Sequence, residues 1–211
     1  MHVQVVQRED RPFFASELDC FFRARHKVYA EELRWVPESP SGREYDQFDT
    51  EAATYLLVLD GSELIAGSRM ISTDHPHLLS EVFPHAVTLA PLPRDPKVIE
   101  WTRGFIVPEH REGAGLKLKA ACSLAVMEYC LAIGARKVGG IQDAKWLAIW
   151  RRMGFEIERL GEPMDIGGED WLPAYVHVTT EALARAQAKA GFAPGGRILV
   201  WGQQDRRKVV A

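Results

Sequence analysis

The sequence has few of the features that mark secreted, membrane-spanning or nucleic-acid-binding proteins. Its three cysteines, Cys20, Cys122 and Cys130, are odd in number and match no disulfide or metal-ligand spacing. No apolar run is long enough to span a bilayer, and residues 1–6 lack the long apolar core of a signal peptide. A net charge of -3 provides no global basic field for nucleic acid or an anionic membrane. We therefore expect a cytoplasmic protein with reduced thiols and no nucleic-acid or membrane partner.

The composition is that of an ordinary globular protein. Of the 211 residues, 46% are hydrophobic and 26% are charged, and no internal repeat or low-complexity tract is present. This length is enough for one domain with a substantial core. We predict a single domain over residues 1–211, in which residues 181–211 form a weakly specified C-terminal helix and tail.

Hydrophobic periodicity and turn residues divide the chain into strands and helices. The expected strands cover residues 3–6, 54–59, 64–72, 98–107, 136–141, 155–160 and 174–179. The expected helices cover residues 13–33, 78–83, 115–133, 145–153 and 181–190. A meander in the first half, followed by strand–helix repeats in the second, predicts a mixed α/β sheet flanked by helices.

The strand expected at residues 98–107 carries two charges among apolar residues. Glu100 and Arg103 both lie within it, between Pro96 and Pro108. Side chains three apart in a strand point to opposite faces unless a bulge intervenes. A charged side chain in an apolar strand is energetically costly unless it is paired with an opposite charge or serves a function. One interpretation is a structural ion pair with another strand, and the other is an active-site strand whose carboxylate and guanidinium face a cleft.

Four other charged residues lack an obvious structural reason. Arg25 falls on or beside the apolar stripe of the first helix, and Arg69 lies inside the second strand of a hairpin. Asp46 and Asp49 lie three residues apart in a long polar loop. The structural alternatives are an arginine that snorkels at the edge of its stripe and a solvated acidic loop. The functional alternative is that the acids hold an arginine or a cationic ligand.

A glycine-containing loop joins the charged strand to the long helix that follows it. Its sequence is Arg111-Glu112-Gly113-Ala114-Gly115, and such loops at helix N-termini bind phosphate. The order of elements around it resembles the GNAT acyltransferase fold. That resemblance implies that the loop takes the pyrophosphate of coenzyme A and that a splayed central strand takes the pantetheine. The loop is one residue shorter than the usual GNAT pattern, Arg/Gln-x-x-Gly-x-Gly/Ala. We expect a GNAT-like mixed sheet with a splayed central strand.

Charged and aromatic residues also recur in a family-specific order over residues 3–170. They are Arg25-His26-Lys27-Val28-Tyr29, Trp35, Glu44-Tyr45-Asp46-Gln47-Phe48-Asp49, Arg69, Phe83 and Glu100-Trp101-Thr102-Arg103. This order resembles the acyl-homoserine-lactone synthases, the LuxI-type autoinducer synthases. The chain departs from the family pattern at Tyr29, where Phe is usual. It departs again at Gly104, where many members have Phe directly after the arginine and this chain has Phe105 one place later.

The resemblance implies an acyltransferase that makes a quorum-sensing signal from S-adenosylmethionine and an acyl thioester. The amine of S-adenosylmethionine attacks the thioester carbonyl. Its carboxylate then attacks its own γ-carbon, which closes a lactone and releases methylthioadenosine. The resemblance implies small-molecule substrates only, with no metal and no bound cofactor.

The resemblance also implies roles for particular side chains. Arg25 is expected to bind the carboxylate of S-adenosylmethionine. Aromatic faces are expected to contact its sulfonium and its adenine, and Glu100 is the candidate base that deprotonates its ammonium group. The predicted catalytic residues are Glu100, Arg103, Asp46, Asp49 and Arg69, of which the last four form a charge network that orders the loop over the nucleotide pocket. The predicted S-adenosylmethionine-binding residues are Arg25, Tyr29, Trp35 and Phe83. A purely structural role is the alternative for each carboxylate.

The acyl and pantetheine groups are expected to contact a further set of residues. This set is Trp101, Thr102, Phe105, Ile141, Gln142 and Trp146, and for most of them the alternative is ordinary core packing. Around residues 43–51 and 79–84 the chain looks like the subgroup that uses branched-chain or aryl coenzyme A thioesters. We therefore favour acyl-coenzyme A as the donor, with acyl carrier protein as the alternative donor and partner.

Two other functions compete with the synthase interpretation. A GNAT-type N-acyltransferase acting on another amine needs only the loop and the charged strand, and leaves Arg25, Trp35 and the Asp46–Asp49 pair without a shared purpose. A non-catalytic member of the fold would bind a nucleotide or thioester without turnover. Release of methylthioadenosine distinguishes the synthase from both.

Overall fold

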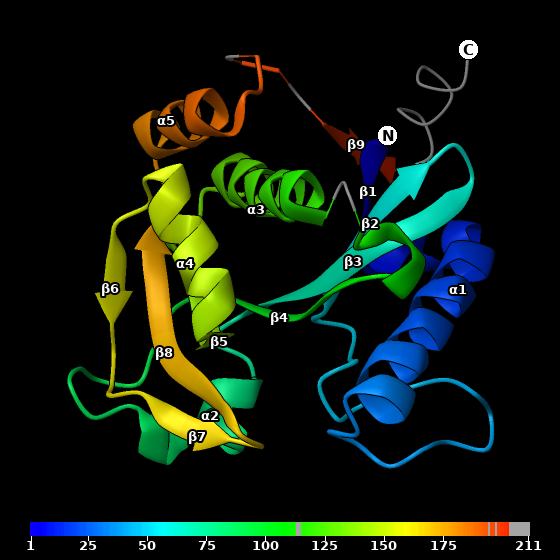
Figure 1. Cartoon of the computed structure of the whole chain (residues 1–211), viewed down its shortest axis with the longest axis horizontal. Coiled ribbons are helices and arrows are strands. Elements are labelled where there is room, and N and C mark those ends of the chain that lie inside the picture. The colour runs from blue at the N-terminus through cyan, green and yellow to red at the C-terminus, as the bar shows by residue number, and fades with distance from the viewer. Residues whose placement is uncertain (113–114, 194, 197, 203–211) are drawn as a thin grey trace. The chain divides into compact units, whose positions relative to one another are not determined.

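The computed structural model describes residues 1–112, 115–193, 195–196 and 198–202, which fall into two compact units (Figure 1). The first unit comprises the described parts of residues 1–69, 103–118 and 198–211. The second comprises the described parts of residues 70–102 and 119–197. Three elements contribute residues to both units, namely β3 (Glu63–Ser72), β4 (Val98–Ile106) and α3 (Gly115–Ala132). The single domain expected from the sequence stays a prediction.

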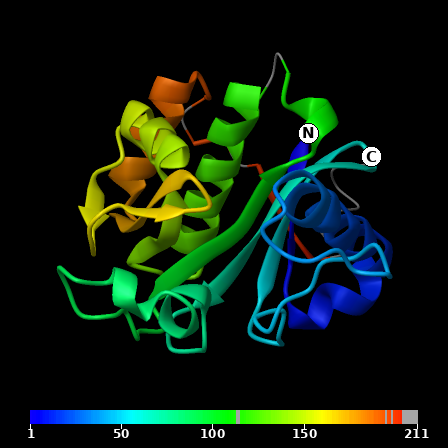
Figure 2. The ribbon, with the colours of Figure 1, turned by 60° about the horizontal axis from the view of Figure 1, so that its bottom comes forward.

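The sheet of the first unit brings the two ends of the described chain together. Its strands follow the order β9-β1-β2-β3. β1 (His2–Val6) is antiparallel to β2 (Thr54–Asp60) and parallel to β9 (Leu199–Trp201). The helical segments are η1 (Arg8–Phe14), α1 (Ala15–His26), η2 (Lys27–Glu32) and η4 (Pro108–His110). α1 lies over one face of β2 and β3 (Figure 2).

Aromatic packing fastens α1 to this sheet. The ring centroid of Phe21 lies 5.2 Å from that of Tyr55 and 5.4 Å from that of Phe105. Gly67 on β3 permits this approach, because a Cβ at that position would lie 2.7 Å from the Phe21 ring. Arg25 follows Phe21 by four residues and therefore leaves α1 on the same face. The hydrophobic packing thus decides where the Arg25 guanidinium is buried.

The second unit is a mixed sheet with helices packed against it. Its strand order is β6-β8-β5-β4, and β7 pairs with β8. β4 and β5 are parallel and pair through three residues each, Val98–Glu100 against Lys137–Gly139, whereas β5 and β8 are antiparallel over seven pairs. The remaining elements are α2 (Leu78–Glu81), η3 (Pro84–Ala86), β5 (Lys137–Asp143), α4 (Ala144–Met153), β6 (Ile157–Arg159), β7 (Met164–Ile166), β8 (Glu169–His177) and α5 (Thr180–Ala190). The short pairing of β4 with β5 is the splay expected of a GNAT-like sheet.

A hydrophobic cluster on this sheet carries α2 and the loop that follows it. Its buried members are Leu79, Ala86, Val98, Ile141, Leu160 and Tyr175. Phe83 packs against the cluster and is partly buried. The cluster therefore fixes the position of the first turn of α2, which matters for the neighbouring Glu100.

The mixed α/β architecture predicted from the sequence is confirmed, with corrections in detail. The helix expected at residues 13–33 is a 3-10 helix, an α-helix and a π-helix in succession. The strand expected to begin at residue 174 begins at Glu169, because Gly167 and Gly168 adopt positive φ and turn the missed strand β7 back onto it. The expected tail contains the missed strand β9. Residues 113–114 of the glycine loop lie outside the described residues. No helix in the described ranges combines the length and apolar character that a bilayer crossing needs.

Candidate active site

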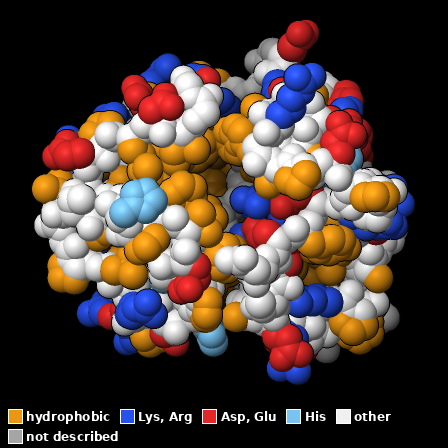
Figure 3. All heavy atoms as spheres, turned by 90° about the horizontal axis from the view of Figure 1, so that it is seen from below, with side chains coloured by type: hydrophobic (Ala, Val, Ile, Leu, Met, Phe, Trp, Pro, Cys, Tyr) orange, Lys and Arg blue, Asp and Glu red, His pale blue; other side chains and the backbone are white. Residues whose placement is uncertain are grey.

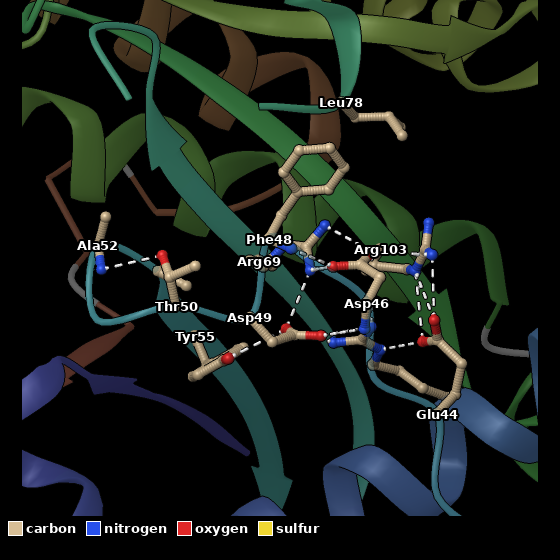
Figure 4. Close-up of polar contacts among 12 residues, drawn as sticks. Glu44, Asp46, Phe48, Asp49, Thr50, Ala52, Tyr55, Arg69, Leu78 and Arg103 are labelled. Carbon is tan, nitrogen blue, oxygen red and sulfur yellow. Dashed lines mark hydrogen bonds and ion pairs between the residues drawn. The ribbon is translucent and has the colours of Figure 1, made fainter. Parts of the chain in front are cut away.

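Six charged side chains of the first unit form one cluster, which we call the charge network (Figure 4). Its members are Arg25 from α1, Glu44, Asp46 and Asp49 from the loop before β2, Arg69 from β3 and Arg103 from β4. Three guanidinium groups face three carboxylates, so the formal charge of the cluster is zero. Such balance is what allows charges to be buried, because an unpaired charge in the same place would be strongly disfavoured.

Arg25 is the most enclosed member of the charge network. Its side chain is fully buried, and its Nε donates to Glu44. Its Nη1 and Nη2 donate to the two carboxylate oxygens of Asp49 at 2.8 and 3.0 Å. The guanidinium carbon also lies 5.6 and 5.3 Å from the ring centroids of Phe21 and Phe22. The sequence places Arg25 among substrate-binding residues, whereas these donors are directed at carboxylates of the protein itself.

Arg69 and Arg103 link the remaining carboxylates. Arg69 donates from Nη1 to Asp49 at 2.9 Å and from Nη2 to Asp46 at 3.0 Å. Arg103 lies 3.0 Å from Glu44 and 2.9 Å from Asp46 through its Nη2. The Arg103 side chain is 14% exposed, whereas those of Arg25 and Arg69 are fully buried. Arg103 is therefore the most exposed of the three arginine side chains of the network.

The loop is folded locally by its own aspartates. The backbone N–H of Phe48 donates to the Asp46 carboxylate at 2.9 Å, and that of Asp46 donates to the Asp49 carboxylate at 2.8 Å. The Tyr55 hydroxyl adds a further bond to Asp49 at 3.0 Å. The three-residue spacing of the aspartates thus closes a turn and presents both carboxylates to the arginines.

The arginines keep Asp49 ionised despite its burial. Burial acts to raise the pKa of Asp49, but the hydrogen bonds and positive charges of Arg25 and Arg69 outweigh it and hold the pKa well below its ordinary value of 3.8. Burial likewise opposes the charge of Arg25, yet Asp49 and Glu44 raise the pKa of its guanidinium. The ionised state of Asp49 and that of Arg25 therefore stabilise each other.

Arg103 occupies an unusual place in β4. Its φ is +52°, a left-handed value that non-glycine residues seldom adopt. This departure interrupts the regular alternation of faces between Glu100 and Arg103, as a bulge would. Backbone strain of this kind costs on the order of 1–3 kcal/mol and persists where surrounding interactions enforce it. Here the bonds from Arg103 to Glu44 and Asp46 supply that enforcement.

An aromatic pair adjoins the network. Tyr29 is buried, and its hydroxyl donates to the Gly104 carbonyl at 2.9 Å. The Arg103 guanidinium carbon lies 5.3 Å from the Tyr29 ring centroid, and the Trp35 ring centroid lies 5.7 Å from that of Tyr29. Trp35 is 43% exposed. Tyr29 therefore carries a structural hydrogen bond that the phenylalanine usual in the related family pattern lacks, and burial raises its pKa to about 12.

Glu100 forms a separate site in the second unit. Its side chain is fully buried, and its two carboxylate oxygens accept the backbone N–H groups of Leu79 at 2.7 Å and Leu78 at 2.9 Å. These amides open the first turn of α2. Gly140 on β5 leaves room for the carboxylate stem, because a Cβ there would lie 3.0 Å from Glu100 Cγ.

The residues predicted to contact the acyl group do not form one cluster. Trp101, Gln142 and Trp146 lie together, with the Trp101 and Trp146 ring centroids 5.3 Å apart and Gln142 Nε2 donating to the Trp101 carbonyl at 3.1 Å. Ile141 belongs to the hydrophobic cluster around Leu79 and Tyr175, and Thr102 is buried on β4. Phe105 packs in the first unit against Phe21 and Tyr29. A stacked third ring, Trp150, lies 5.5 Å from Trp101.

Sequence reasoning missed several contributors to these sites. Glu44 lies within the acidic motif but is not among the predicted site residues, although it bridges Arg25 and Arg103. Its position two residues before Asp46 was the available signal. The backbone N–H groups of Leu78 and Leu79 carry no side-chain signature, so no pattern could have revealed them.

Charged side chains are distributed differently in the buried cluster and on the surface. Within the described ranges, no group of three His, Cys, Asp or Glu side chains is arranged to hold a metal ion. Acidic and basic side chains are interspersed on the face shown in Figure 3. The acidic cluster that does exist, in the charge network, is occupied by arginines.

Comparison with known proteins gives a consistent answer. The profile of the autoinducer synthase family matches residues 12–186. Isovaleryl-homoserine lactone synthase from Bradyrhizobium diazoefficiens is 34% identical over 183 residues, which cover 86% of this chain and 82% of that protein. The structure of BjaI, a coenzyme A-dependent acyl-homoserine lactone synthase with S-adenosylmethionine and isopentyl-coenzyme A, gives a TM-score of 0.85 at 31% identity and covers 100% of this chain and 99% of that one.

A more distant likeness concerns the fold alone. An acyl-coenzyme A N-acyltransferase from Pseudomonas aeruginosa gives a TM-score of 0.51 at 15% identity, over 84% of this chain and 98% of that one. The GNAT-like architecture predicted from the order of elements is thereby confirmed.

Proposed function

Since the chain belongs to the autoinducer synthase family, we propose that it is an acyl-homoserine-lactone synthase that joins S-adenosylmethionine to an acyl-coenzyme A. The amine nitrogen of S-adenosylmethionine forms an amide with the acyl carbon, and the coenzyme A thiol leaves. A carboxylate oxygen then bonds to the γ-carbon, and methylthioadenosine leaves with the sulfur. The observation that carries the choice of donor is the likeness to BjaI, whose structure holds S-adenosylmethionine and isopentyl-coenzyme A.

We infer a short, branched or aryl acyl group from the tryptophans of the second unit. The ring centroids of Trp146 and Trp150 lie 5.3 and 5.5 Å from that of Trp101, and Gln142 donates a hydrogen bond to the Trp101 carbonyl. Three indoles occupy space that a long acyl chain would need, and their faces suit a compact apolar or aromatic group. The relative that makes isovaleryl-homoserine lactone supports the same size class.

We assign the role of base to Glu100. A carboxylate offers about four lone-pair positions, and the amides of Leu78 and Leu79 take one on each oxygen. We propose that this carboxylate accepts a proton from the ammonium group of the substrate. The two amides orient the carboxylate through one hydrogen bond to each of its oxygens.

We assign substrate contact in the charge network to its exposed edge. Arg103 presents a partly exposed guanidinium beside the Tyr29–Trp35 pair, which suits a carboxylate next to a sulfonium or an adenine. Arg25 lies behind it, with its donors on Glu44 and Asp49. A direct contact of Arg25 with substrate would require one of these bonds to be exchanged, so we propose that Arg25 positions the network.

The test is a product assay with the purified full chain. S-adenosylmethionine is supplied with a panel of acyl-coenzyme A and acyl-carrier-protein thioesters, and products are identified by mass spectrometry. We expect an acyl-homoserine lactone and methylthioadenosine, with the best turnover from a branched-chain or aryl coenzyme A thioester. The variant Glu162→Gln, which changes an exposed acid, serves as a control that should match the wild type.

Other outcomes would replace parts of the proposal. Preference for carrier-protein thioesters would overturn the choice of donor but keep the reaction. Free thiol formed from thioester and another amine, without methylthioadenosine, would replace the synthase with a GNAT-type N-acyltransferase. Binding of S-adenosylmethionine with no turnover of any thioester would favour a non-catalytic member of the fold.

A further inference from the structure

Arg11 of η1 binds the end of the loop that carries the three carboxylates of the charge network. Its Nη2 donates to the Thr50 carbonyl at 2.7 Å and to the Ala53 carbonyl at 2.6 Å. These two residues also close a turn, because the N–H of Ala53 donates to the Thr50 carbonyl at 3.1 Å. A single nitrogen of Arg11 therefore holds both ends of the turn that joins Asp49 to β2.

The partners of Arg11 differ in kind from those of the network arginines. The three arginines of the network donate to carboxylates, whereas Arg11 donates to two backbone carbonyls. A carbonyl has no net charge, so these two bonds do not neutralise a buried anion. They depend instead on the path of the loop backbone. We therefore expect the loss of Arg11 to shift the loop, whereas the loss of a network arginine leaves a charge unpaired.

A second contact connects Arg11 to the network through Tyr55. The guanidinium carbon of Arg11 lies 5.2 Å from the centroid of the Tyr55 ring, within the range of a cation–π interaction. The Tyr55 hydroxyl donates to the Asp49 carboxylate at 3.0 Å (Figure 4). Asp49 also directly precedes Thr50, and consecutive Cα atoms lie about 3.8 Å apart. Arg11 is thus connected to Asp49 both along the backbone and through the ring.

The position of Asp49 affects Arg103 through Asp46. The Asp49 carboxylate accepts the N–H of Asp46 at 2.8 Å, and the Asp46 carboxylate lies 2.9 Å from Nη2 of Arg103. Arg103 is the arginine to which we assign contact with the substrate carboxylate. A displacement of the turn at residues 50–53 would therefore reach the substrate-binding group through Asp49 and Asp46, although Arg11 itself lies outside the charge network.

We propose that Arg11 is a positioning residue for S-adenosylmethionine binding, because it holds the turn and the ring that fix the carboxylates beside Arg103. The inference rests on the proposed function, since it takes S-adenosylmethionine as the ligand at the exposed edge of the network. It adds a residue that precedes the family-specific order of charged and aromatic residues, which begins at Arg25. Binding of the acyl thioester, which we place in the second unit, should not depend on Arg11.

The test compares Arg11→Met with Arg8→Met in the full chain. Methionine keeps an apolar stem beside Tyr55 but has no donor for the two carbonyls. We expect Arg11→Met to raise the KM for S-adenosylmethionine, and its Kd by calorimetry, by about tenfold. The KM for the best acyl-coenzyme A of the product assay should stay unchanged. Arg8 lies on the same helix and contacts the same loop through an exposed pair with Glu51 at 2.9 Å, so Arg8→Met should stay within about twofold of the wild type.

Arg11→Lys and hydrogen exchange separate positioning from a general loss of stability. Both bonds of Arg11 leave from one nitrogen, and a lysine ammonium has three donors, so Arg11→Lys should restore most of the lost affinity. The backbone amides of Asp46 and Phe48, which bond to the loop's own aspartates, should exchange faster in Arg11→Met but not in Arg8→Met. A role in stability alone would lower the fraction of protein that binds and leave KM and Kd at their wild-type values.

Three results would overturn the inference. The first is wild-type affinity for S-adenosylmethionine in Arg11→Met, and the second is an equal loss of affinity in Arg8→Met. The third is a loss in Arg11→Met that Arg11→Lys does not restore and that leaves the exchange of the loop amides unchanged. Failure of the proposed function is recognised separately, because the wild type itself would then bind no S-adenosylmethionine. Arg11→Gln, whose shorter side chain loses the same two bonds, replaces Arg11→Met if that variant does not fold.

Discussion

The charge network and the Glu100 site hold buried carboxylates by different means. In the network, three carboxylates are balanced by three guanidinium groups, and most of their bonds are between side chains. At the second site, one carboxylate is held by two backbone N–H groups at the start of α2. Side-chain charges can be removed one at a time by mutation, whereas backbone dipoles cannot.

Because the two sites hold their carboxylates differently, we expect mutations in the charge network to affect mainly folding stability and mutation of Glu100 to affect mainly the reaction. Removal of one member of a balanced cluster leaves another charge buried and unpaired, so the cost falls on the fold. Removal of the Glu100 charge leaves two amides that an uncharged side chain of the same shape can partly satisfy, so the cost falls on the reaction. The following predictions are ordered from the largest expected effect to the smallest.

Glu100→Gln should give the largest effect, a loss of about 100- to 10,000-fold in turnover, because a positioned general base contributes that much. The glutamine oxygen can accept only one of the two amides well, so the free energy of unfolding should fall by about 1–3 kcal/mol. Steady-state kinetics and urea unfolding check the two parts. Turnover like that of the wild type would remove Glu100 from its assigned role.

Arg25→Met should lower the free energy of unfolding by about 3–5 kcal/mol, because it leaves Glu44 and Asp49 buried without their shared cation. Arg23→Met, two residues earlier on α1, is the matched control. Arg23 is half exposed and forms an ion pair with Asp19, so its loss should cost far less than the loss of Arg25. Urea denaturation measures both. Equal costs would mean that the network contributes no more than a surface ion pair.

Calorimetry with S-adenosylmethionine on Arg25→Met then asks whether Arg25 contacts substrate or positions other groups. Weaker binding that Arg25→Lys restores would favour a direct charge contact, since lysine keeps the charge but cannot reproduce the forked geometry. Weaker binding in both variants would favour the positioning role.

Acid should weaken the fold through Asp49. Its folded pKa lies well below the ordinary value of 3.8, so the unfolded state binds more protons as the pH falls through that range. The stabilisation is therefore complete above about pH 5 and is lost progressively below pH 4, by at most about 1.4 kcal/mol per pH unit. Urea midpoints measured from pH 5 downward should show a shallower slope in Asp49→Asn. Parallel slopes would exclude Asp49 as the titrating group.

Tyr29→Phe should have the smallest effect, a loss of about 0.5–1.5 kcal/mol in the free energy of unfolding, because it removes only the bond from the hydroxyl to the Gly104 carbonyl. The ring, and with it the contact to Arg103, is kept. A tenfold loss of turnover in this variant would instead indicate that the hydroxyl takes part in the reaction.

The sequence predicts the types of most elements, because these depend on short-range patterns. The family resemblance predicts Asp46, Asp49, Arg69 and Arg103 as a network, but it assigns Arg25 to substrate binding and does not single out Glu44. Apolar spacing places Arg25 on or beside the apolar face of the first helix, and Asp46 and Asp49 lie three residues apart in a long polar loop. The pairing of particular carboxylates with particular arginines, such as Glu44 with both Arg25 and Arg103, depends on packing between segments far apart in the sequence. Spacing alone cannot supply it.

Other features had no sequence pattern from which to be predicted. The positive φ of Arg103 interrupts the alternation of side-chain faces that was assumed for strand β4. The identity of the residue, arginine, does not predict that backbone conformation. β9 was missed because three residues in a glycine-rich context carry too little periodicity, and only its partner β1 makes it a strand. The backbone amides that hold Glu100 were also missed, because a backbone group leaves no side-chain signature in the sequence.

The parallel pairing of β9 with β1 has a consequence for how the protein is made. β1 is translated before β9, yet Val3, Gln4 and Val5 face Leu199, Val200 and Trp201, and the buried Gln4 side chain donates to the Val200 carbonyl at 3.2 Å. One edge of β1 therefore stays open until β9 has been made, and it offers unpaired backbone groups to any neighbouring chain. Of the strands in the described ranges, the one furthest along the chain is the one that closes this edge.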